Sequence, residues 1–208
     1  MQRVLCLLIG YCFGIILTAE IVTRHVAGVR PDDMGSKNPG MANVMRELGF
    51  KPGIIVLAGD CAKTAAALFL CRALFPSLHA LSMFYAMMGV VLGHNFPIWK
   101  HFRGGKGVAV TCVSIFIISP LWGLAANIVG FLAVLITGYL PLGAVLIPLA
   151  FIPLAFIYFG PESGVLIGLC TVIMFLRHCK GLRRIHRGEE KKMHLLKWIK
   201  NKKQHGEG

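Results

Sequence analysis

Charged residues are scarce in this chain, and acidic residues are the scarcest. Only 15% of the 208 residues are charged, against roughly 25% in ordinary soluble domains, and Asp and Glu together number nine. Hydrophobic residues make up 56% of the chain. This composition argues against intrinsic disorder and against a soluble globular fold. The 22 Lys and Arg residues give a formal net charge of +13, which suggests an integral membrane protein with its basic residues on one side.

Several catalytic and metal-binding motifs are also missing. The seven cysteines form no C-x-x-C pair, so we expect small buried side chains, no metal site and no cofactor. There is no G-x-S-x-G elbow for an acyl-enzyme and no G-x-x-x-x-G-K-[ST] loop. The chain also lacks the H-x-x-x-x-D signature of one acyltransferase class and the acid-rich motif of CDP-alcohol transferases.

Long apolar segments dominate what is present. A helix needs about 20 mostly apolar residues to cross a bilayer. The candidate spans are roughly 3–22, 53–75, 79–95, 107–121, 122–139, 142–159 and 163–179, of which the fourth is short for a full crossing. The first lacks a small-residue cleavage site, so we interpret it as an uncleaved helix. The sequence therefore predicts an all-α integral membrane protein of seven helices, with one transmembrane domain over 1–180 and a basic tail over 181–208.

Basic residues concentrate in three polar stretches. The segments 23–51 and 94–106 hold five and three Lys and Arg residues, and the region from 177 onward holds eleven. The positive-inside rule places all three in the cytoplasm, and seven crossings then put the N-terminus outside. The tail 191–203 spaces Met193, Leu196 and Ile199 along one helical face, which suits an interfacial helix on anionic lipid. Nucleic acid is not the expected partner.

Two ionisable residues lie within the second span. Asp60 and Lys63 are three residues apart, so they share a helix face and can pair. Charges at membrane depth usually face the interior of the bundle. A structural pair that locks helix packing and a pair that positions an active site both remain open.

The first basic stretch contains an unusual set of small and polar residues. Ser36, Asn38 and Asn43 offer short hydrogen-bonding groups, and Arg46 can grip a phosphate through two parallel hydrogen bonds. A polar connector that merely obeys the positive-inside rule is the alternative. The residue types taken together favour binding or catalysis.

The second basic stretch reads Gly104-Gly105-Lys106-Gly107 directly before the fourth span. Glycines before a helix expose its first N–H groups, and the helix dipole favours an anion there. Lys106 adds a positive charge. His94 lies at the start of the same stretch, and Arg177 and His178 lie at the start of the third. For each histidine, a structural and a catalytic role both remain open.

These three stretches resemble the motifs of the bacterial acyl-phosphate-dependent glycerol-3-phosphate acyltransferases, in order, spacing and membrane context. The second motif is the most specific, and the resemblance covers nearly the whole chain. The matching residues are Gly35-Ser36, Asn38, Gly40, Asn43 and Arg46, then Gly93-His94, Phe96-Pro97 and Gly104-Gly105-Lys106-Gly107-Val108-Ala109, then Arg177-His178, Gly188 and Glu190.

The resemblance implies a multi-pass enzyme of the bacterial inner membrane whose active site faces the cytoplasm. Its substrates would be acyl phosphate and glycerol 3-phosphate, and its product 1-acylglycerol 3-phosphate would begin phospholipid synthesis. The implied phosphate-binding residues are Gly104, Gly105, Lys106, Gly107 and Arg177. The implied catalytic residues are Ser36, Asn38, Asn43, Arg46, His94 and His178, with either histidine or a substrate phosphate oxygen as the base.

The chain departs from the family pattern at several positions. Lys37 replaces a glycine of the first motif, Pro141 stands where the family has a serine, and Gly181 stands where it has an asparagine. These departures keep two alternatives open: a diverged member that binds lipid or uses another acceptor, and a small anion transporter. The sequence leaves the oligomeric state unknown.

Overall fold

The computed structural model describes residues 1–190 and residue 192, in which every regular element is a helix. The interfacial helix expected over 191–203 lies outside the described residues, apart from Lys192. The α-helices are α1 Gln2–Gly14, α2 Thr18–Ala27, α3 Met41–Leu48, α4 Phe50–Leu74, α5 Ala80–Asn95, α6 Val108–Ile118, α7 Pro120–Thr137, α8 Leu140–Phe159 and α9 Pro161–His186. Short 3₁₀ turns lie at η1 Pro31–Asp33, η2 Pro76–Leu78 and η3 Ile98–Lys100.

The spans match the apolar segments of the sequence, with one exception in length. Six helical stretches in the described part are long and apolar enough to cross a membrane: Gln2–Ala27, Phe50–Leu74, Ala80–Lys100, Pro120–Thr137, Leu140–Phe159 and Pro161–His186. Helix α6 has 11 residues and rises about 16 Å, roughly half of a hydrocarbon core. An all-helical membrane protein is thus confirmed, whereas the seventh crossing stays a prediction.

The first span, expected as an uncleaved helix over roughly 3–22, is present over Gln2–Ala27 but is interrupted between α1 and α2. The chain leaves the helix after α1 and re-enters it at α2, so the carbonyls of Ile15 and Ile16 lose their helical partners. Trp99 donates its indole N–H to Ile15 O at 2.8 Å, and Lys63 Nζ donates to Ile16 O at 2.6 Å. A break at membrane depth persists where protein groups satisfy the freed backbone, as these two side chains do.

Helices α1 and α5 pack closely through glycine. Gly10 and Gly14 on α1 face Gly89 and Gly93 on α5, four residues apart on each helix. A Cβ on Gly10 would lie 2.1 Å from Ala86 O, and one on Gly89 would lie 2.1 Å from Leu7 O. Small residues at this spacing allow backbones in a membrane to approach closely. The contact fixes α5, whose C-terminal end carries His94.

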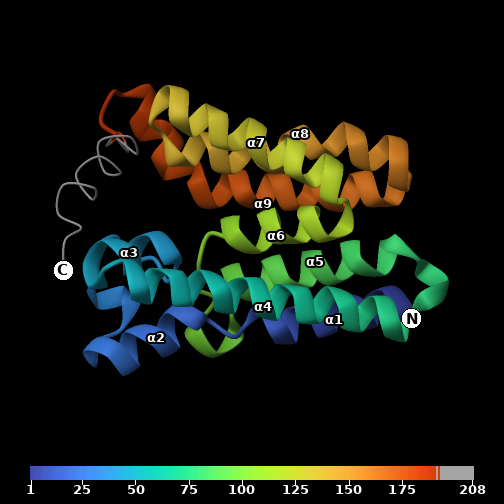
Figure 1. Ribbon diagram of the computed structural model, residues 1–208, viewed down its shortest axis with the longest axis horizontal. Coiled ribbons are helices and arrows are strands. Elements are labelled where there is room, and N and C mark those ends of the chain that lie inside the picture. Colours follow the sequence, from blue (N-terminus) through green and yellow to red (C-terminus); the bar gives the residue numbers. More distant parts are fainter. Residues whose placement is uncertain (191, 193–208) are drawn as a thin grey trace.

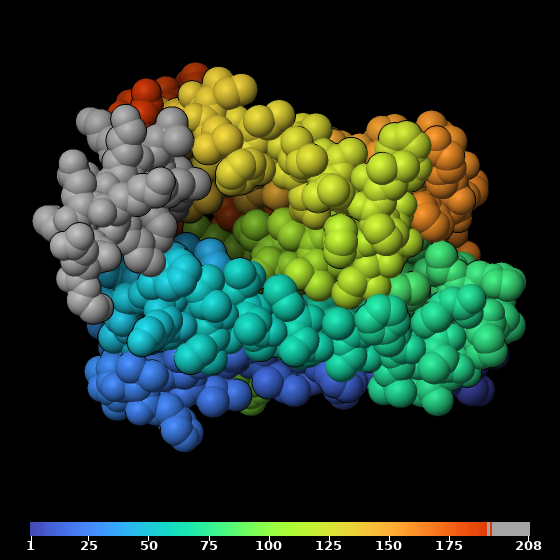
Figure 2. Space-filling model, viewed as in Figure 1, coloured from blue at the N-terminus to red at the C-terminus, as the bar shows by residue number. Residues whose placement is uncertain are grey.

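The long helices run side by side along the long axis of the molecule (Figure 1). The loop between α2 and α4, the loop between α5 and α6, and the C-terminal end of α9 gather at one end, whereas the N-terminus lies near the other. The three polar stretches of the sequence therefore meet in space. The space-filling view shows α7 along one side of the molecule (Figure 2), where Leu121, Ile136 and other large apolar side chains are exposed, as suits a lipid-facing helix.

Candidate active site

The glycine-rich loop before α6 folds back onto the end of α5. Gly104 N donates to Asn95 O at 3.1 Å, and Gly105 N donates to His94 O at 2.9 Å. A Cβ on Gly104 would lie 2.1 Å from His94 O, and one on Gly105 would lie 2.2 Å from His94 Nε2. Larger residues would push the loop away from α5, so these glycines are required by the close approach.

Arg177 fixes the same loop from α9. Its guanidinium donates to Gly104 O at 2.8 Å and to Gly105 O at 2.8 and 3.1 Å, and it lies over the Phe96 ring at 5.5 Å. The sequence assigned Arg177 to phosphate binding, and in the structure this side chain holds the loop backbone. Direct contact with a phosphate stays a prediction.

His94 is buried within a network of charged groups. Lys63 Nζ lies 2.7 Å from Asp60 Oδ1 and 3.1 Å from His94 Nδ1, so the ion pair expected from the sequence spacing is present. Thr18 adds a hydrogen bond to Asp60 Oδ1 at 3.1 Å. Because the Lys63 ammonium can only donate, Nδ1 accepts and the ring proton lies on Nε2, toward Gly105. The network therefore joins the break in the first span to the glycine-rich loop.

His178 and Lys106 lie close enough to interact electrostatically. His178 is buried, and its Nδ1 lies 2.9 Å from Met174 O, so Nδ1–H donates and Nε2 carries the lone pair of the neutral ring. Lys106 is half-buried, and burial lowers the pKa of its ammonium group, an effect that the nearby Glu190 carboxylate partly opposes. A cation and a ring nitrogen able to accept a proton thus lie within electrostatic range of each other.

Gly107 lets the chain enter α6 directly from this loop. Its φ of +80° is a left-handed conformation that favours glycine, and Thr111 N donates to Gly107 O at 3.0 Å in the first helical turn. The first amides of α6 therefore lie next to Lys106. A helix N-terminus beside a cation is a suitable place for an anion.

The first loop is organised around Asn43, which is buried. Its Oδ1 accepts a hydrogen bond from Ser36 N at 2.8 Å, and its Nδ2 donates to Met34 O at 3.1 Å. Ser36 is exposed, and Asn38 is half-buried. Arg46 is exposed, and its side chain makes no hydrogen bond or ion pair with any other described residue. In the structure Asn43 shapes the loop that presents Ser36; its catalytic role stays a prediction.

The two departures at 141 and 181 meet in space. A Cβ on Gly181 would lie 2.7 Å from Pro141 Cγ, so no larger residue fits at 181 beside this proline without displacement. Helix α9 continues through Gly181 to His186, so the predicted domain boundary at 180 falls inside a helix.

Sequence reasoning missed one buried cluster beside the site. Lys100 was counted only as a loop cation, yet it is 4% exposed, and its Nζ lies 2.6 Å from Glu20 Oε2. Trp99, whose indole N–H bonds the Ile15 carbonyl at the break in the first span, was also not singled out. An acidic residue at the end of an apolar span was the available signal, because a buried carboxylate requires a cationic partner.

Membrane helices bring a glycine-rich loop, a lysine and a buried histidine to one end of the bundle. This arrangement defines an integral membrane protein with a candidate anion site. A protein-family model described as glycerol-3-phosphate acyltransferase matches residues 4–188. The chain belongs to the glycerol-3-phosphate acyltransferase family, and thus to the membrane acyltransferases of phospholipid synthesis.

Relatives match over nearly their full length. Glycerol-3-phosphate acyltransferase 1 of Lactobacillus johnsonii is 39% identical over 202 residues, covering 97% of this chain and 98% of that protein. Its namesake in Lactobacillus acidophilus is 36% identical over 206 residues, with 97% of each chain covered.

Solved structures share the fold. The glycerol 3-phosphate form of PlsY (YgiH), an integral membrane glycerol 3-phosphate acyltransferase, has a TM-score of 0.84 at 24% identity and covers 96% of this chain and 99% of its own. The lysophosphatidic acid form has a TM-score of 0.81 at the same identity, with 94% and 97% covered.

Proposed function

We propose that this protein transfers a fatty acyl group from acyl phosphate to the 1-hydroxyl of glycerol 3-phosphate and so forms 1-acylglycerol 3-phosphate. The carrying observation is the loop Gly104–Gly107, which precedes α6, is held by Arg177 and carries Lys106 within electrostatic range of His178. The names of the relatives support the acceptor. The choice of acyl phosphate as donor rests on the motif resemblance.

Phosphate binding is assigned to Lys106 and to the amides at the start of α6. Arg177 acts on this site through the loop backbone, since three of its hydrogen bonds go to the carbonyls of Gly104 and Gly105. Fixed donors of this kind stabilise charge without having to reorganise during the reaction.

Direct attack by the glycerol hydroxyl needs no acyl-enzyme. The hydroxyl oxygen bonds the acyl carbon, its proton passes to a base, and the bond from the acyl carbon to the phosphate oxygen breaks as phosphate leaves. His178 Nε2 is the better placed base, because His94 Nδ1 accepts from Lys63 and His94 Nε2 is pressed against Gly105. Ser36, Asn38 and Arg46 are assigned to the departing phosphate. A base of this kind contributes about 10²–10⁴-fold.

The membrane topology belongs to the same proposal. Seven crossings, with α6 as a shortened one, place the N-terminus outside and the three loops in the cytoplasm, at the inner membrane. The gathering of those loops at one end of the molecule supports this orientation (Figure 1). Single cysteines at exposed positions, such as Lys37 and Ser77, should be labelled from opposite sides of sealed vesicles in a cysteine-free background; labelling from the same side contradicts the topology.

The activity test is direct. Protein purified in detergent, given palmitoyl phosphate and labelled glycerol 3-phosphate, should form labelled lysophosphatidate, whereas palmitoyl-CoA should not replace the donor. Lys106→Ala should nearly abolish the use of glycerol 3-phosphate while the protein stays folded, and Lys180→Ala, an exposed cation on α9, is the matched control. Unchanged kinetics of Lys106→Ala would refute the phosphate role. Uptake of labelled anion by vesicles without acyl product would favour the transporter alternative.

One observation favours a second candidate, an altered acceptor. Pro141 and Gly181 form a contact without hydrogen-bonding side chains at the positions where the family has serine and asparagine. A series of hydroxyalkyl phosphates offered with palmitoyl phosphate separates the two candidates. Gly181→Asn alone should lower activity, because the asparagine clashes with Pro141, and adding Pro141→Ser should restore the activity. If the unmodified protein prefers an acceptor other than glycerol 3-phosphate, the second candidate is favoured.

A further inference from the structure

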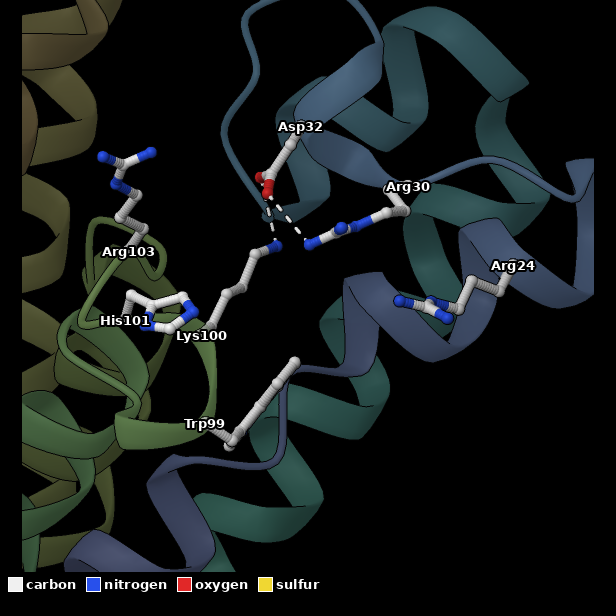
Figure 3. A pocket seen from close by; sticks show the side chains of 7 residues that line it. All are labelled: Arg24, Arg30, Asp32, Trp99, Lys100, His101 and Arg103. Atoms are coloured by element: carbon white, nitrogen blue, oxygen red, sulfur yellow. Dashed lines mark ion pairs between the residues drawn. The ribbon is translucent and has the colours of Figure 1, made fainter.

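A second basic pocket lies outside the proposed active site. This cavity of about 380 Å³ lies where α2, η1 and η3 meet (Figure 3). It is lined by Arg24, Arg30, Asp32, Trp99, Lys100, His101 and Arg103. None of these residues carries a role in the acyl transfer proposed above, so the cavity is available for another ligand.

Three of the four cations of this pocket are held in place by a buried carboxylate. Glu20 is 5% exposed, and its oxygens lie 2.6 Å from Lys100 Nζ, 3.0 Å from Arg24 Nη2 and 3.4 Å from Arg30 Nε. Lys100 itself is buried. Arg24 and Arg30 are about half exposed, so their guanidinium groups remain accessible to a ligand. The pocket is therefore preorganised by the fold.

Positive charge remains after these pairings. Arg24, Arg30, Lys100 and Arg103 bring four cations, against the carboxylates of Glu20 and Asp32. Figure 3 shows the Asp32 carboxylate between Lys100 and Arg30, at 3.1 and 3.7 Å from their nitrogens. An anion with more oxygens than a carboxylate suits this arrangement, since guanidinium groups bind phosphate through paired hydrogen bonds.

The turn that follows η3 has an unusual backbone. His101 and Phe102 have φ values of +50° and +60°, a left-handed conformation that is costly for residues other than glycine. Strain of this kind persists where the surrounding structure holds it, and it gathers at binding sites. Here it brings His101 and Arg103 to the pocket wall.

The segment that contributes Trp99, Lys100, His101 and Arg103 to the pocket also carries exposed apolar side chains, which we call its rim. Ile98 is 62% exposed, Trp99 48% and Phe102 56%. Exposed aromatic side chains beside cations are typical of the membrane–water interface, where lipid phosphates lie. We propose that this pocket binds a phosphate ester at the membrane surface, with the headgroup of an anionic phospholipid as the source that the rim favours.

The test measures lipid binding to the full-length protein. Protein purified in a neutral detergent is titrated with phosphatidylglycerol or phosphatidylcholine, and bound lipid is counted by native mass spectrometry. We expect one phosphatidylglycerol bound more tightly than phosphatidylcholine. Arg30→Gln should weaken that binding about five- to tenfold, as expected for one cation near an anionic surface, and Asp32→Asn should strengthen it.

Two further variants control for folding and position. Arg103 is exposed, and its side chain makes no hydrogen bond or ion pair in the described part of the chain, so Arg103→Gln should weaken lipid binding without disturbing the fold. Lys51→Gln, which replaces an exposed cation on α4, should leave lipid binding unchanged.

A further titration tests whether the phosphate bound by this pocket can come from a soluble molecule instead of a lipid. It uses the Lys106→Ala variant, in which the proposed active site no longer holds phosphate. Inorganic phosphate and glycerol 3-phosphate are titrated there. If they bind and compete with phosphatidylglycerol, and Arg30→Gln weakens both, the phosphate chemistry stands with a soluble source as well. If both lipids bind alike and neither Arg30→Gln nor Arg103→Gln changes the affinity for any probe, the proposal is overturned.

Discussion

The first and second loops of the proposed site are built in opposite ways. In the second loop Gly104 and Gly105 are buried, and their N–H and C=O groups bond to α5 and to Arg177. In the first loop Ser36 and Arg46 are exposed, and the hydrogen bonds are local to the loop: Asn43 bonds Ser36 N and Met34 O, and Lys37 N donates to Met34 O. The difference implies that the second loop forms its binding site before substrate arrives, whereas the first acquires further contacts from the substrate.

The largest effect should come from the second loop. Gly104→Ala places a methyl group 2.1 Å from His94 O, so the loop must move and take Lys106 with it. We expect kcat/KM to fall by more than about 10²-fold, since a displacement of about 1 Å is enough for such a loss. Gly168→Ala on α9 has no atom within 4 Å of its new Cβ and should keep activity. Equal activity of the two variants would show that the loop is not preorganised.

A similar loss of activity without loss of stability should mark the first loop. Arg46→Ala removes an exposed side chain that makes no hydrogen bond or ion pair with another described residue, so Tm should change little. Activity should fall by about 10²-fold, the cost of one donor aimed at developing charge. Arg183→Ala, also exposed, is the matched control. A small loss of activity in Arg46→Ala would mean that Arg46 only contributes positive charge on the cytoplasmic side and takes no part in catalysis.

A smaller effect should follow from loosening the first loop. Asn43→Ala leaves Ser36 N without its partner and removes one of the two donors to Met34 O, and an unpaired polar group costs about 1–3 kcal/mol where it is buried. We expect about a tenfold loss of kcat/KM together with a lower Tm. The neighbouring Ala42→Ser change, at a half-buried position, controls for local polarity. Retention of full activity at a lowered Tm would assign Asn43 to the fold alone.

The sequence predicts the helices far better than the contacts between them. Long apolar runs place α4 and α8 within three residues of their observed bounds, because hydrophobic length is a local property. The break after α1 depends on Trp99 and Lys63, which lie far along the chain, so no local pattern could reveal it.

The same limit applies within the site. Residue types identified the glycine-rich loop and the histidines, since those types carry the chemistry. They did not reveal that the Arg177 guanidinium bonds carbonyl oxygens, or that Lys63 occupies one nitrogen of His94. Which atom faces which is decided by helix packing, and the sequence alone does not specify it.

The smallest predicted effect concerns pH and again separates the two loops. Burial lowers the pKa of Lys106 below the ordinary lysine value, so its charge is lost as pH rises through that lowered pKa. Phosphate binding should then weaken on the alkaline side, and kcat/KM for glycerol 3-phosphate should fall there, since this parameter reports the free enzyme. Lys106→Arg keeps its charge and should lose this alkaline decline, whereas Arg46→Lys in the first loop should retain it. If kcat/KM of the Lys106→Arg variant falls at the same pH as that of the unmodified protein, then the group that titrates is not Lys106. The charge of the second loop would then not govern the affinity for glycerol 3-phosphate.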